Sequence, residues 1–391
     1  MSADATRLVY LDHVASSPVD RRVAETICTV IKNNFGNPLN VHTPGQAAQE
    51  IIETARQNVA ALINADPKEI IFTSCGTESN NFALYGLAQA AVGKGKHIIT
   101  SQLEHFSILH ALKNLEQQGF EVTYLPVDKF GFVSPEQVAS AIRNDTILVS
   151  LTHASNEIGT IEPIAEIGKK AKEKGVLFHV DAVQCAGIIP VDVKTLGVDA
   201  LTLASNTFYG PTGVAALYLK KGTRILPYLV GGTQEEGRRA GTHNLAGIAG
   251  MGEAAKIAKA EMAGNSEKLI KLRDKLAQGL VQKIPEFFLT GHPTGRLPGH
   301  VSGVVKYIEG ESMSMLLDME GIAVSTGSAC VSKALKASHV VLAIGVSPED
   351  AHGSLVFSMG KDNTDADVDH VLEKLPPIVE RLRQMSPLYK K

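Results

Sequence analysis

The 391-residue sequence contains no tryptophan and no two cysteines spaced as Cys-x-x-Cys. Its four cysteines, Cys28, Cys75, Cys185 and Cys330, are scattered along the whole chain. Disulfide frameworks and structural zinc sites use cysteines at short, repeated spacings. We therefore expect neither a disulfide framework nor a zinc site, and each cysteine has to be interpreted from its own neighbours.

The sequence also lacks a long apolar run and an excess of either charge. A membrane-spanning helix needs a run of roughly 18–20 apolar residues, and no stretch of this chain has that length. The N-terminal residues MSADATRL are polar and do not resemble a signal peptide. The formal net charge is only −3, which gives no electrostatic reason to expect nucleic acid or a membrane as a partner. These absences favour a cytoplasmic protein.

Short apolar runs alternate with helix-length amphipathic segments from about residue 50 to residue 260. The runs are apolar on both faces, which is typical of strands covered by helices on either side. The alternation predicts an α/β domain at residues 14–260, built on a mostly parallel seven-stranded sheet. The seven strand candidates are EIIFTS, HIITS, EVTYLPV, TILVSLTH, VLFHVDA, DALTLAS and GVAALYL.

The pattern changes after a long amphipathic stretch at residues 251–284, which predicts one or two long helices. The Pro- and Gly-rich segment LTGHPTGRLPGHVSG follows it, and then short strand candidates alternate with helices. This pattern predicts a smaller α+β domain, formed by residues 1–13 together with residues 261–391.

Polar side chains stand at the ends of four predicted strands, where open α/β sheets bind ligands. A glycine turn that opens a helix can hold a phosphate, and an aspartate at the end of a buried strand needs a partner such as a protonated ring nitrogen. Each cluster alone also fits a structural role, as an ordinary N-cap or a packed histidine. Together they favour a ligand site. They are Gly76 with Thr77, His105, Asn156 with Glu157, and Asp181 with Gln184.

These motifs, in this order, resemble the NifS/IscS-type cysteine desulfurases, which are class V members of the fold-type I pyridoxal 5′-phosphate (PLP) enzymes. The resemblance runs nearly end to end and implies a PLP-transferase-like fold. It also implies a cysteine desulfurase-like role in iron–sulfur cluster assembly. The motifs that carry it are VYLDHVASSPVD, FGNPLNVHTPGQAA, FTSCGTESNN, EHFSILH, HASNEIGTIEPI, FHVDAVQCAG, FYGPTGVAALYL, GGTQEEGRRAGTHNLAGIAGMG, STGSAC and GSLVFSMG.

The resemblance implies roles for individual residues. Residues matching Thr242 reach the PLP phosphate of the neighbouring subunit, which implies a homodimer. Cys330, in STGSAC, matches a loop cysteine that attacks the substrate sulfur and becomes a persulfide. The remaining implied roles concern the cofactor itself: Gly76 and Thr77 lie at the phosphate, His105 stacks on the ring and serves catalysis, Asp181 pairs with the ring nitrogen, and Asn156 and Gln184 face the ring hydroxyl.

Two motifs depart from the family pattern. The family has Ser-x-His-Lys before its Tyr-Gly-Pro turn, whereas this chain has Ala204, Ser205, Asn206 and Thr207. Threonine has no amine, so Thr207 cannot form the Schiff base, while Ser205 and Asn206 stay candidates for contacts with the cofactor. An arginine that pairs with the substrate carboxylate is replaced by Val356. Such a bidentate pair is worth roughly 1.5–3 kcal/mol and fixes orientation.

Other lysines and cysteines of the chain do not clearly replace the missing groups. Lys220, Lys221 and Lys333 do not occupy the position of the family lysine, so rescue by one of them is not favoured. Cys75 and Cys185 could line the pocket or simply be small buried apolar residues, and the second interpretation is favoured because free cysteine is often buried. Cys28 is expected in the core.

Three functions remain open from the sequence. The first is a degenerate desulfurase whose Cys330 still carries sulfur or acts as a metal ligand, sharing a [2Fe-2S] cluster with an IscU-type scaffold protein. The second is a slow cysteine desulfurase, a sulfurtransferase that uses non-covalently bound PLP. The third is a non-catalytic dimeric partner. The first is favoured because the cysteine loop is kept.

Overall fold

The computed structural model describes residues 8–327 and 337–389. Its largest element is a seven-stranded sheet with the strand order β2-β8-β7-β6-β5-β3-β4. Strand β8 is antiparallel to both of its neighbours, and the other neighbouring strands are parallel. The seven predicted strands are confirmed, as β2 (Ile70–Thr73), β3 (His97–Ser101), β4 (Glu121–Leu125), β5 (Thr146–Thr152), β6 (Leu177–Asp181), β7 (Ala200–Ala204) and β8 (Ala215–Leu219).

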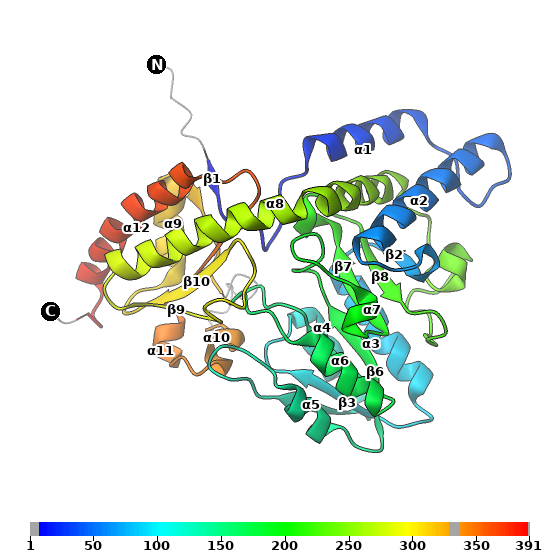
Figure 1. Cartoon of the computed structure of the whole chain (residues 1–391), viewed down its shortest axis with the longest axis horizontal. Helices are drawn as coiled ribbons and strands as arrows, with labels where there is room; N and C mark the ends of the chain where they lie inside the picture. The colour runs from blue at the N-terminus through cyan, green and yellow to red at the C-terminus, as the bar shows by residue number, and fades with distance from the viewer. Residues whose placement is uncertain (1–7, 328–336, 390–391) are drawn as a thin grey trace.

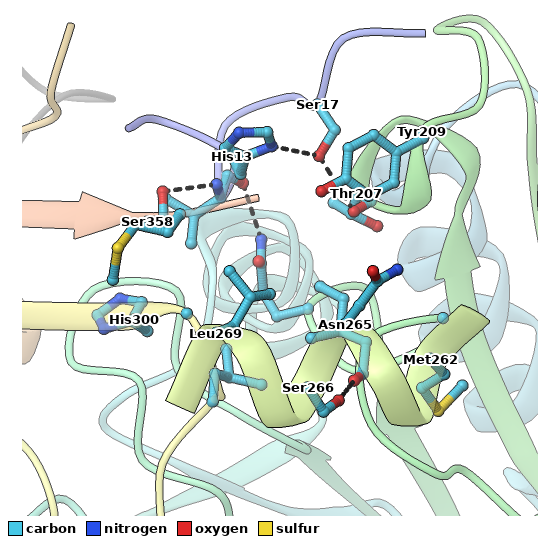
Figure 2. Close-up of a pocket in the computed structure, with 17 residues that line it drawn as sticks. His13, Ser17, Thr207, Tyr209, Met262, Asn265, Ser266, Leu269, His300 and Ser358 are labelled. Atoms are coloured by element: carbon cyan, nitrogen blue, oxygen red, sulfur yellow. Dashed lines mark hydrogen bonds between the residues drawn. The ribbon is translucent and has the colours of Figure 1, made fainter. Parts of the chain in front are cut away.

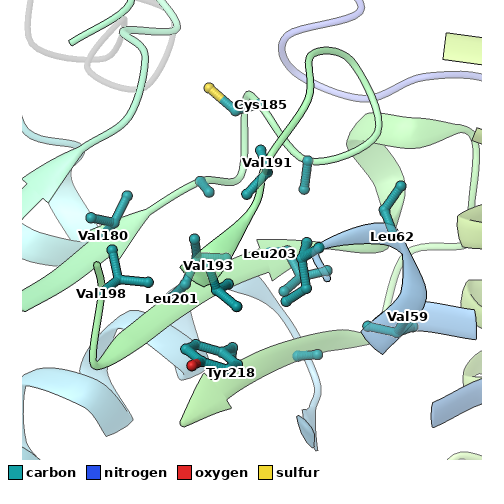
Figure 3. Close-up of a cluster of buried hydrophobic side chains, with 14 of the residues drawn as sticks. Val59, Leu62, Val180, Cys185, Val191, Val193, Val198, Leu201, Leu203 and Tyr218 are labelled. Carbon is teal, nitrogen blue, oxygen red and sulfur yellow. The ribbon is translucent and has the colours of Figure 1, made fainter. Parts of the chain in front are cut away.

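Buried apolar side chains lie on both faces of this sheet. One cluster joins alternate residues of β5, β6 and β7, such as Val149, Val180 and Leu203, to residues of α2 and α6. Figure 3 shows part of this cluster, with Val180, Leu201 and Leu203 on strands of the sheet and Val59 and Leu62 on α2. A second cluster fills the opposite face beneath α3 and α4. Alternating residues therefore bury both strand faces, as expected for a sheet between two helical layers. The helices are α1 (Arg21–Asn33), α2 (Thr43–Leu62), α3 (Gly76–Ala91), α4 (Phe106–Gln117), α5 (Pro135–Ala141), α6 (Ile164–Glu173) and α7 (Val193–Leu196).

Helix α8 (Leu245–Lys283) is a single helix of 39 residues. Figure 1 shows it running from beside α1 and α2 to beside α12 (Asp365–Met385). Its first half contributes Met251 and Ala255 to the core of the large sheet, and its second half contributes Leu272 and Leu276 to a separate core. The division into two domains at residue 260 stays a prediction, and that residue falls inside α8.

The second core lies around two smaller sheets. Strands β9 (Phe287–Leu289), β10 (His300–Val305) and β12 (Ser354–Ser358) form an antiparallel sheet with β10 at its centre. The N-terminal strand β1 (Val9–Tyr10) pairs with β11 (Ile322–Ala323), which brings the start of the chain to this region. Three more helices accompany these strands, α9 (Gly310–Met319), α10 (His339–Ala343) and α11 (Pro348–Ala351). The expected α+β pattern is thus present.

The expectation for Cys28 was wrong, because its side chain is exposed. Helix α1 buries a narrow stripe that contains Val23 and Val30, three to four residues to either side of Ile27. Cys28 follows Ile27 directly, so it lies about 100° around the helix from this stripe. No helix in the described part of the chain is both long and apolar enough to cross a membrane.

Candidate functional site

A cavity of about 400 Å³ lies where β5, β6 and β7 end, beside the first turn of α3. This volume is within the range of about 300–1,000 Å³ that is typical of small-molecule sites. The cavity brings together seven residues predicted for cofactor binding. They are Gly76, Thr77, His105, Asn156, Asp181, Gln184 and Asn206.

The first turn of α3 forms one end of the cavity. Cys75 is the N-cap residue, and its sulfur accepts a hydrogen bond from the Glu78 backbone N–H at 3.4 Å. The N–H groups of Gly76 and Thr77 are the first two of the helix, which have no partner within a helix and favour an anion. A Cβ atom at Gly76 would lie 3.0 Å from the Val183 side chain, so glycine keeps this approach open. The turn therefore has the features of a phosphate cradle.

Cys75 is exposed and lines the cavity, so its interpretation as a buried apolar residue was wrong. Cys185 does fit that interpretation, because it is fully buried in the core beside the large sheet (Figure 3). Burial raises the pKa of the Cys185 thiol well above its usual range. Only the first of these two thiols faces the site.

Asp181 ends β6 at the centre of the cavity and is 6% exposed. Its carboxylate accepts hydrogen bonds from the Val183 N–H at 3.0 Å and from the Asn80 amide at 2.7 Å. Burial raises the pKa of Asp181 above its ordinary value. A protonated ring nitrogen would supply the positive charge that such a carboxylate needs.

Asn80 and Ser107 link Asp181 to His105, and the sequence analysis did not identify either residue. The Asn80 Nδ2 also donates to Ser107 Oγ at 2.9 Å, and that hydroxyl lies 2.8 Å from His105 Nδ1. The Asn80 Oδ1 atom is buried with no partner among the described residues, which leaves one acceptor available to a ligand. Asn80 lies within the quoted motif TESNN, but sequence alone does not say which asparagine faces the site.

Glu104 is a second residue that the sequence analysis missed. Its Oε1 atom accepts hydrogen bonds from Ser101 Oγ at 2.6 Å and from the Thr152 N–H at 3.1 Å. Its Oε2 atom has no partner within the described residues, and burial raises the pKa of Glu104 to about 8. The cavity wall therefore contains a carboxylic acid that is neutral at pH 7.

Residues from the N-terminal segment close the cavity on another side. The Gln184 Nε2 donates to the Val14 carbonyl at 2.9 Å, and the Asn206 Nδ2 donates to the Ala15 carbonyl at 3.2 Å. Both Val14 and Ala15 line the cavity. The motif LDHVASSP contributes to the family resemblance, but the resemblance implies no role for Val14 or Ala15.

Thr207 lies in a 3₁₀ turn, η2 (Ser205–Phe208), directly after β7. Its hydroxyl lies 2.7 Å from the Val183 carbonyl and 2.9 Å from the Ala204 carbonyl, so it donates its hydrogen bond to backbone oxygens. Ser205 does not line the cavity; its hydroxyl packs against Gly210, where a Cβ atom would lie 1.9 Å away. Val356 is 3% exposed and also lines the cavity.

None of the described residues that line the cavity is a lysine or an arginine. Lys220 pairs with Asp199 at 3.1 Å outside the cavity wall, and Lys221 does not line the cavity either. Thr242 is exposed and lies outside the cavity of its own chain. Cys330 and Lys333 lie outside the described residues.

A much smaller cavity of about 60 Å³ lies behind Thr207. Figure 2 shows it between His13, the turn that carries Thr207 and Tyr209, and the α8 residues Met262 and Leu269. It shares Thr207 and Gln184 with the large cavity. A cavity needs about 10–15 Å³ to hold one water molecule, so the small cavity has room for a few waters and not for a cofactor.

The Aminotransferase class-V family model matches residues 9–371 of this chain. The chain is 52% identical over 382 residues to the cysteine desulfurase IscS of Methanosarcina thermophila, covering 98% of this chain and 94% of that protein. It is 48% identical to cysteine desulfurase IscS 1 of Archaeoglobus fulgidus, covering 98% of this chain and all of that protein. The chain belongs to the NifS/IscS-type cysteine desulfurase family.

Solved structures of this family share the fold. A NifS-like protein superposes with a TM-score of 0.90 at 37% identity, covering 96% of this chain and 100% of that chain. The NifS-like protein from Rickettsia africae has a TM-score of 0.87 at 31% identity, covering 96% of this chain and 100% of that chain. The fold is therefore the fold-type I PLP-dependent α/β fold.

PLP is the cofactor of this family, and most of this cavity fits it. Asp181 and the unpartnered Asn80 Oδ1 suit the ring, and the α3 turn at Gly76 and Thr77 suits the phosphate. Among the described residues of the cavity wall, no side chain is an amine that could react with the PLP aldehyde. The described donor set thus fits the ring and the phosphate of the cofactor.

Proposed function

We propose that this protein is a cysteine desulfurase-like protein of iron–sulfur cluster assembly whose PLP chemistry is lost or greatly weakened. The observation that carries the proposal is the cavity wall, where Thr207 and Val356 stand at the positions for which the family resemblance implies lysine and arginine. The relatives named cysteine desulfurase IscS support the sulfur-handling part of the proposal.

The chain's own residues would hold PLP without a covalent bond. Asp181 would hold the protonated ring nitrogen, with Asn80 and Val183 N–H fixing its carboxylate. The N–H groups of Gly76 and Thr77 would bind the phosphate. PLP supplies an aromatic ring that withdraws electrons from the amino acid bonded to it.

The missing groups act on different steps. Without an amine at position 207, no side chain there can exchange with the incoming amino acid or move a proton at its Cα. Without a cation at position 356, the substrate carboxylate meets an apolar wall that supplies neither charge nor orientation. Loss of a catalytic group commonly lowers the rate by about 10²–10⁴-fold.

Cys330 would accept sulfur or share a metal cluster. In the desulfurase reaction the C–S bond of cysteine breaks and an S–S bond to Cys330 forms. L-cysteine and the Cys330 thiol then give L-alanine and a Cys330 persulfide, with no external oxidant or reductant. A thiolate is also a good iron ligand, so the same residue would complete a [2Fe-2S] cluster on an IscU-type scaffold supplied with sulfide.

Metal binding would need such a partner. In the described part of the chain, no group of three or more His, Cys, Asp or Glu side chains is arranged to hold a metal ion. We therefore propose that most cluster ligands come from the scaffold protein. The proposed homodimer would bring Thr242 of each protomer to the phosphate end of the other protomer's cavity.

The test compares wild type with Thr207→Lys and with Thr207→Lys/Val356→Arg, each purified with added PLP. Alanine release from L-cysteine, and sulfide release with dithiothreitol added to reduce the Cys330 persulfide, are measured. Bound PLP is followed by its absorbance before and after borohydride reduction. We expect PLP to be removable from wild type and fixed by reduction in both lysine variants. We expect the double variant to turn over at least about 100-fold faster than wild type.

Two results would overturn this proposal. Wild-type turnover within tenfold of the double variant, lost in Cys330→Ala, would establish the second candidate, a working desulfurase with non-covalent PLP; the nearly complete ring and phosphate cradle favours that candidate. Absence of turnover in the double variant, despite PLP fixed at residue 207, would instead favour a non-catalytic dimeric partner.

A further inference from the structure

A largely buried ion pair joins the first turn of α3 to the segment 231–244. Arg239 Nε donates a hydrogen bond to Glu78 Oε1 at 2.8 Å, and Arg239 Nη2 donates to Glu78 Oε2 at 3.1 Å. The two side chains are only 16% and 15% exposed. A two-point pair between a guanidinium and a carboxylate fixes the position of both groups. The positive charge of Arg239 is therefore held at one carboxylate of the helix whose N-terminus forms an end of the cavity.

The Glu78 carboxylate reaches back across the turn that forms the phosphate cradle. Its Oε2 atom accepts hydrogen bonds from the Ser74 N–H at 2.8 Å and from the Ser74 hydroxyl. It thus spans the residues between them, which include Gly76 and Thr77 of the cavity wall. Although burial alone would raise it, the hydrogen bonds from Arg239 and Ser74 lower the pKa of Glu78. The carboxylate is therefore ionised at neutral pH.

An ionised carboxylate at this place opposes the binding of a phosphate. Two anions repel one another, and the repulsion is strong where protein replaces water. Without a cation, Glu78 would offset the positive N-terminal end of α3, which favours anions. Neither Glu78 nor Arg239 is among the described residues that line the cavity. The pair therefore acts on a ligand through its charge and not by contact.

The helix N-terminus is not the only feature that indicates a ligand here. Asn80 lies one turn after Gly76 on α3, is 1% exposed and lines the same cavity. Its Oδ1 atom has no partner among the described residues. A buried acceptor without a partner is costly unless a ligand supplies a donor. The cavity beside this turn is therefore suited to a ligand with polar groups.

We propose that Arg239 is a positioning residue that acts through Glu78: it neutralises the Glu78 carboxylate, so that the first turn of α3 can bind the cofactor phosphate. The part that concerns the cofactor rests on the proposed function. The part that concerns the charge at the turn does not, because it depends only on contacts among described residues.

The test separates the charge of Arg239 from its structural contacts. Arg239→Gln removes the charge, Arg239→Lys keeps it, and Arg239→Gln/Glu78→Gln removes both charges of the pair. Arg238→Gln is the matched control, because it removes the same charge one residue away, where Arg238 pairs with Glu236. Dissociation constants are measured for pyridoxamine 5′-phosphate and for pyridoxamine, which share the ring and differ in the phosphate.

We expect Arg239→Gln to weaken the binding of pyridoxamine 5′-phosphate by about tenfold, because an unpaired carboxylate then faces the phosphate. The binding of pyridoxamine should change by less than about twofold, because it has no phosphate to repel. Arg239→Lys, the double variant and Arg238→Gln should stay within about threefold of wild type for both ligands, because none of them leaves Glu78 as an unpaired anion.

The charge at the turn can also be measured without a cofactor, through the exposed thiol of Cys75. Iodoacetate is an anion and iodoacetamide is neutral, and both alkylate the thiolate. The ratio of their rates at one cysteine therefore reports the local electrostatic potential. At low ionic strength we expect this ratio at Cys75 to fall about threefold in Arg239→Gln and to recover in the double variant. The exposed Cys28 of α1 is the internal control and should keep its ratio in every variant.

Three results would overturn the proposal. Equal losses for the two ligands in Arg239→Gln would mean that the cavity changed and not its charge. A loss that persists in the double variant would mean that Arg239 acts by holding the segment 231–244. An unchanged alkylation ratio at Cys75 would mean that the pair does not set the charge at the turn. If wild type binds neither ligand, the proposed function fails, while the ratio at Cys75 still decides whether Arg239 neutralises Glu78.

Discussion

At the scale of single residues, Glu104 has an environment that its position in the sequence does not disclose. It is fully buried, its Oε1 atom accepts two hydrogen bonds, and burial raises its pKa to about 8. In the unfolded chain a glutamate ionises near pH 4.3. Between these two pH values the folded protein keeps a proton that the unfolded chain has lost, so stability should fall as the pH rises.

Replacement of Glu104 by glutamine should remove that contribution. We expect the free energy of unfolding of Glu104→Gln, relative to wild type, to rise between pH 5 and pH 8 by up to about 1.4 kcal/mol per pH unit. Urea unfolding at several pH values would measure this difference. The exposed Glu166→Gln, on α6, is the control and should differ from wild type by a constant amount. A difference for Glu104→Gln that does not change with pH would contradict the prediction.

The residues of the site were predictable to different degrees. Asp181 and Thr77 could be found because each follows a recognisable buried strand, and strand ends are where such sheets bind ligands. Asn80 and Ser107 could not, because their role depends on which side of a helix turn faces Asp181. The orientation of Ser205 was not predictable either. The sequence makes it a candidate for cofactor contact, but its hydroxyl packs against Gly210 and not toward the cavity.

At the scale of elements, the segment 231–244 is held to the large sheet by a buried acid. The Glu235 carboxylate accepts two hydrogen bonds from Arg56 of α2, at 2.7 Å and 3.0 Å, and one from the Phe72 N–H of β2 at 3.0 Å. His243 Nε2 lies 2.8 Å from the same carboxylate. Although burial alone would raise it, the hydrogen bonds from His243 and Arg56 hold the pKa of Glu235 at about 2.

Removal of this carboxylate should be costly. Glu235→Ala removes the carboxylate that accepts two hydrogen bonds from the partly buried Arg56 guanidinium, which keeps only weaker support from Glu53 at 3.2 Å and from the Ile70 carbonyl. Loss of one member of a buried ion pair typically costs about 3–5 kcal/mol, so we expect a loss of about 3 kcal/mol. Chemical unfolding near pH 7 measures this loss of stability. In wild type, the stabilisation by the ionised Glu235 carboxylate should fade as the pH drops from about 4.5 toward 2. The neighbouring Glu236→Ala is the matched control, because Glu236 also has a positive φ but is exposed and pairs with Arg238 at the surface. A loss at Glu235 no larger than at Glu236 would contradict this account.

The elements themselves were largely predictable. The seven strands of the large sheet are apolar on both faces, and this pattern is strong wherever helices cover a sheet on two sides. The burial of α1 was not predictable in the same way, because its inward stripe is narrow and Cys28 falls just beside it. Whether residues 251–284 formed one helix or two also stayed open, because packing and not periodicity keeps α8 continuous.

At the scale of the whole molecule, several large apolar side chains have no cover in the single chain. Phe35 is 88% exposed, Val41 is 90% exposed, and Val230 is 80% exposed. Exposed apolar residues mark a protein interface where they form a contiguous patch. Thr242 is exposed as well, so a partner subunit could reach it in the proposed homodimer.

The dimer can be tested through the cofactor site, because the proposed site takes Asp181 from one protomer and Thr242 from the other. We expect Asp181→Ala and Thr242→Ala each to weaken PLP binding when purified alone. After the two variants are mixed, partially unfolded and refolded together, random pairing makes about half of all dimers hybrids, and each hybrid has one intact site out of two.

About one quarter of all sites should therefore recover wild-type affinity for PLP, as measured by absorbance titration of the mixture. The matched mixture of Asp181→Ala with Asp181→Ala/Thr242→Ala contains no intact site and should recover none. Recovery in neither mixture, with both variants dimeric, would mean that Thr242 does not act across the interface. Each cavity would then have to bind the phosphate with the α3 turn of its own chain alone.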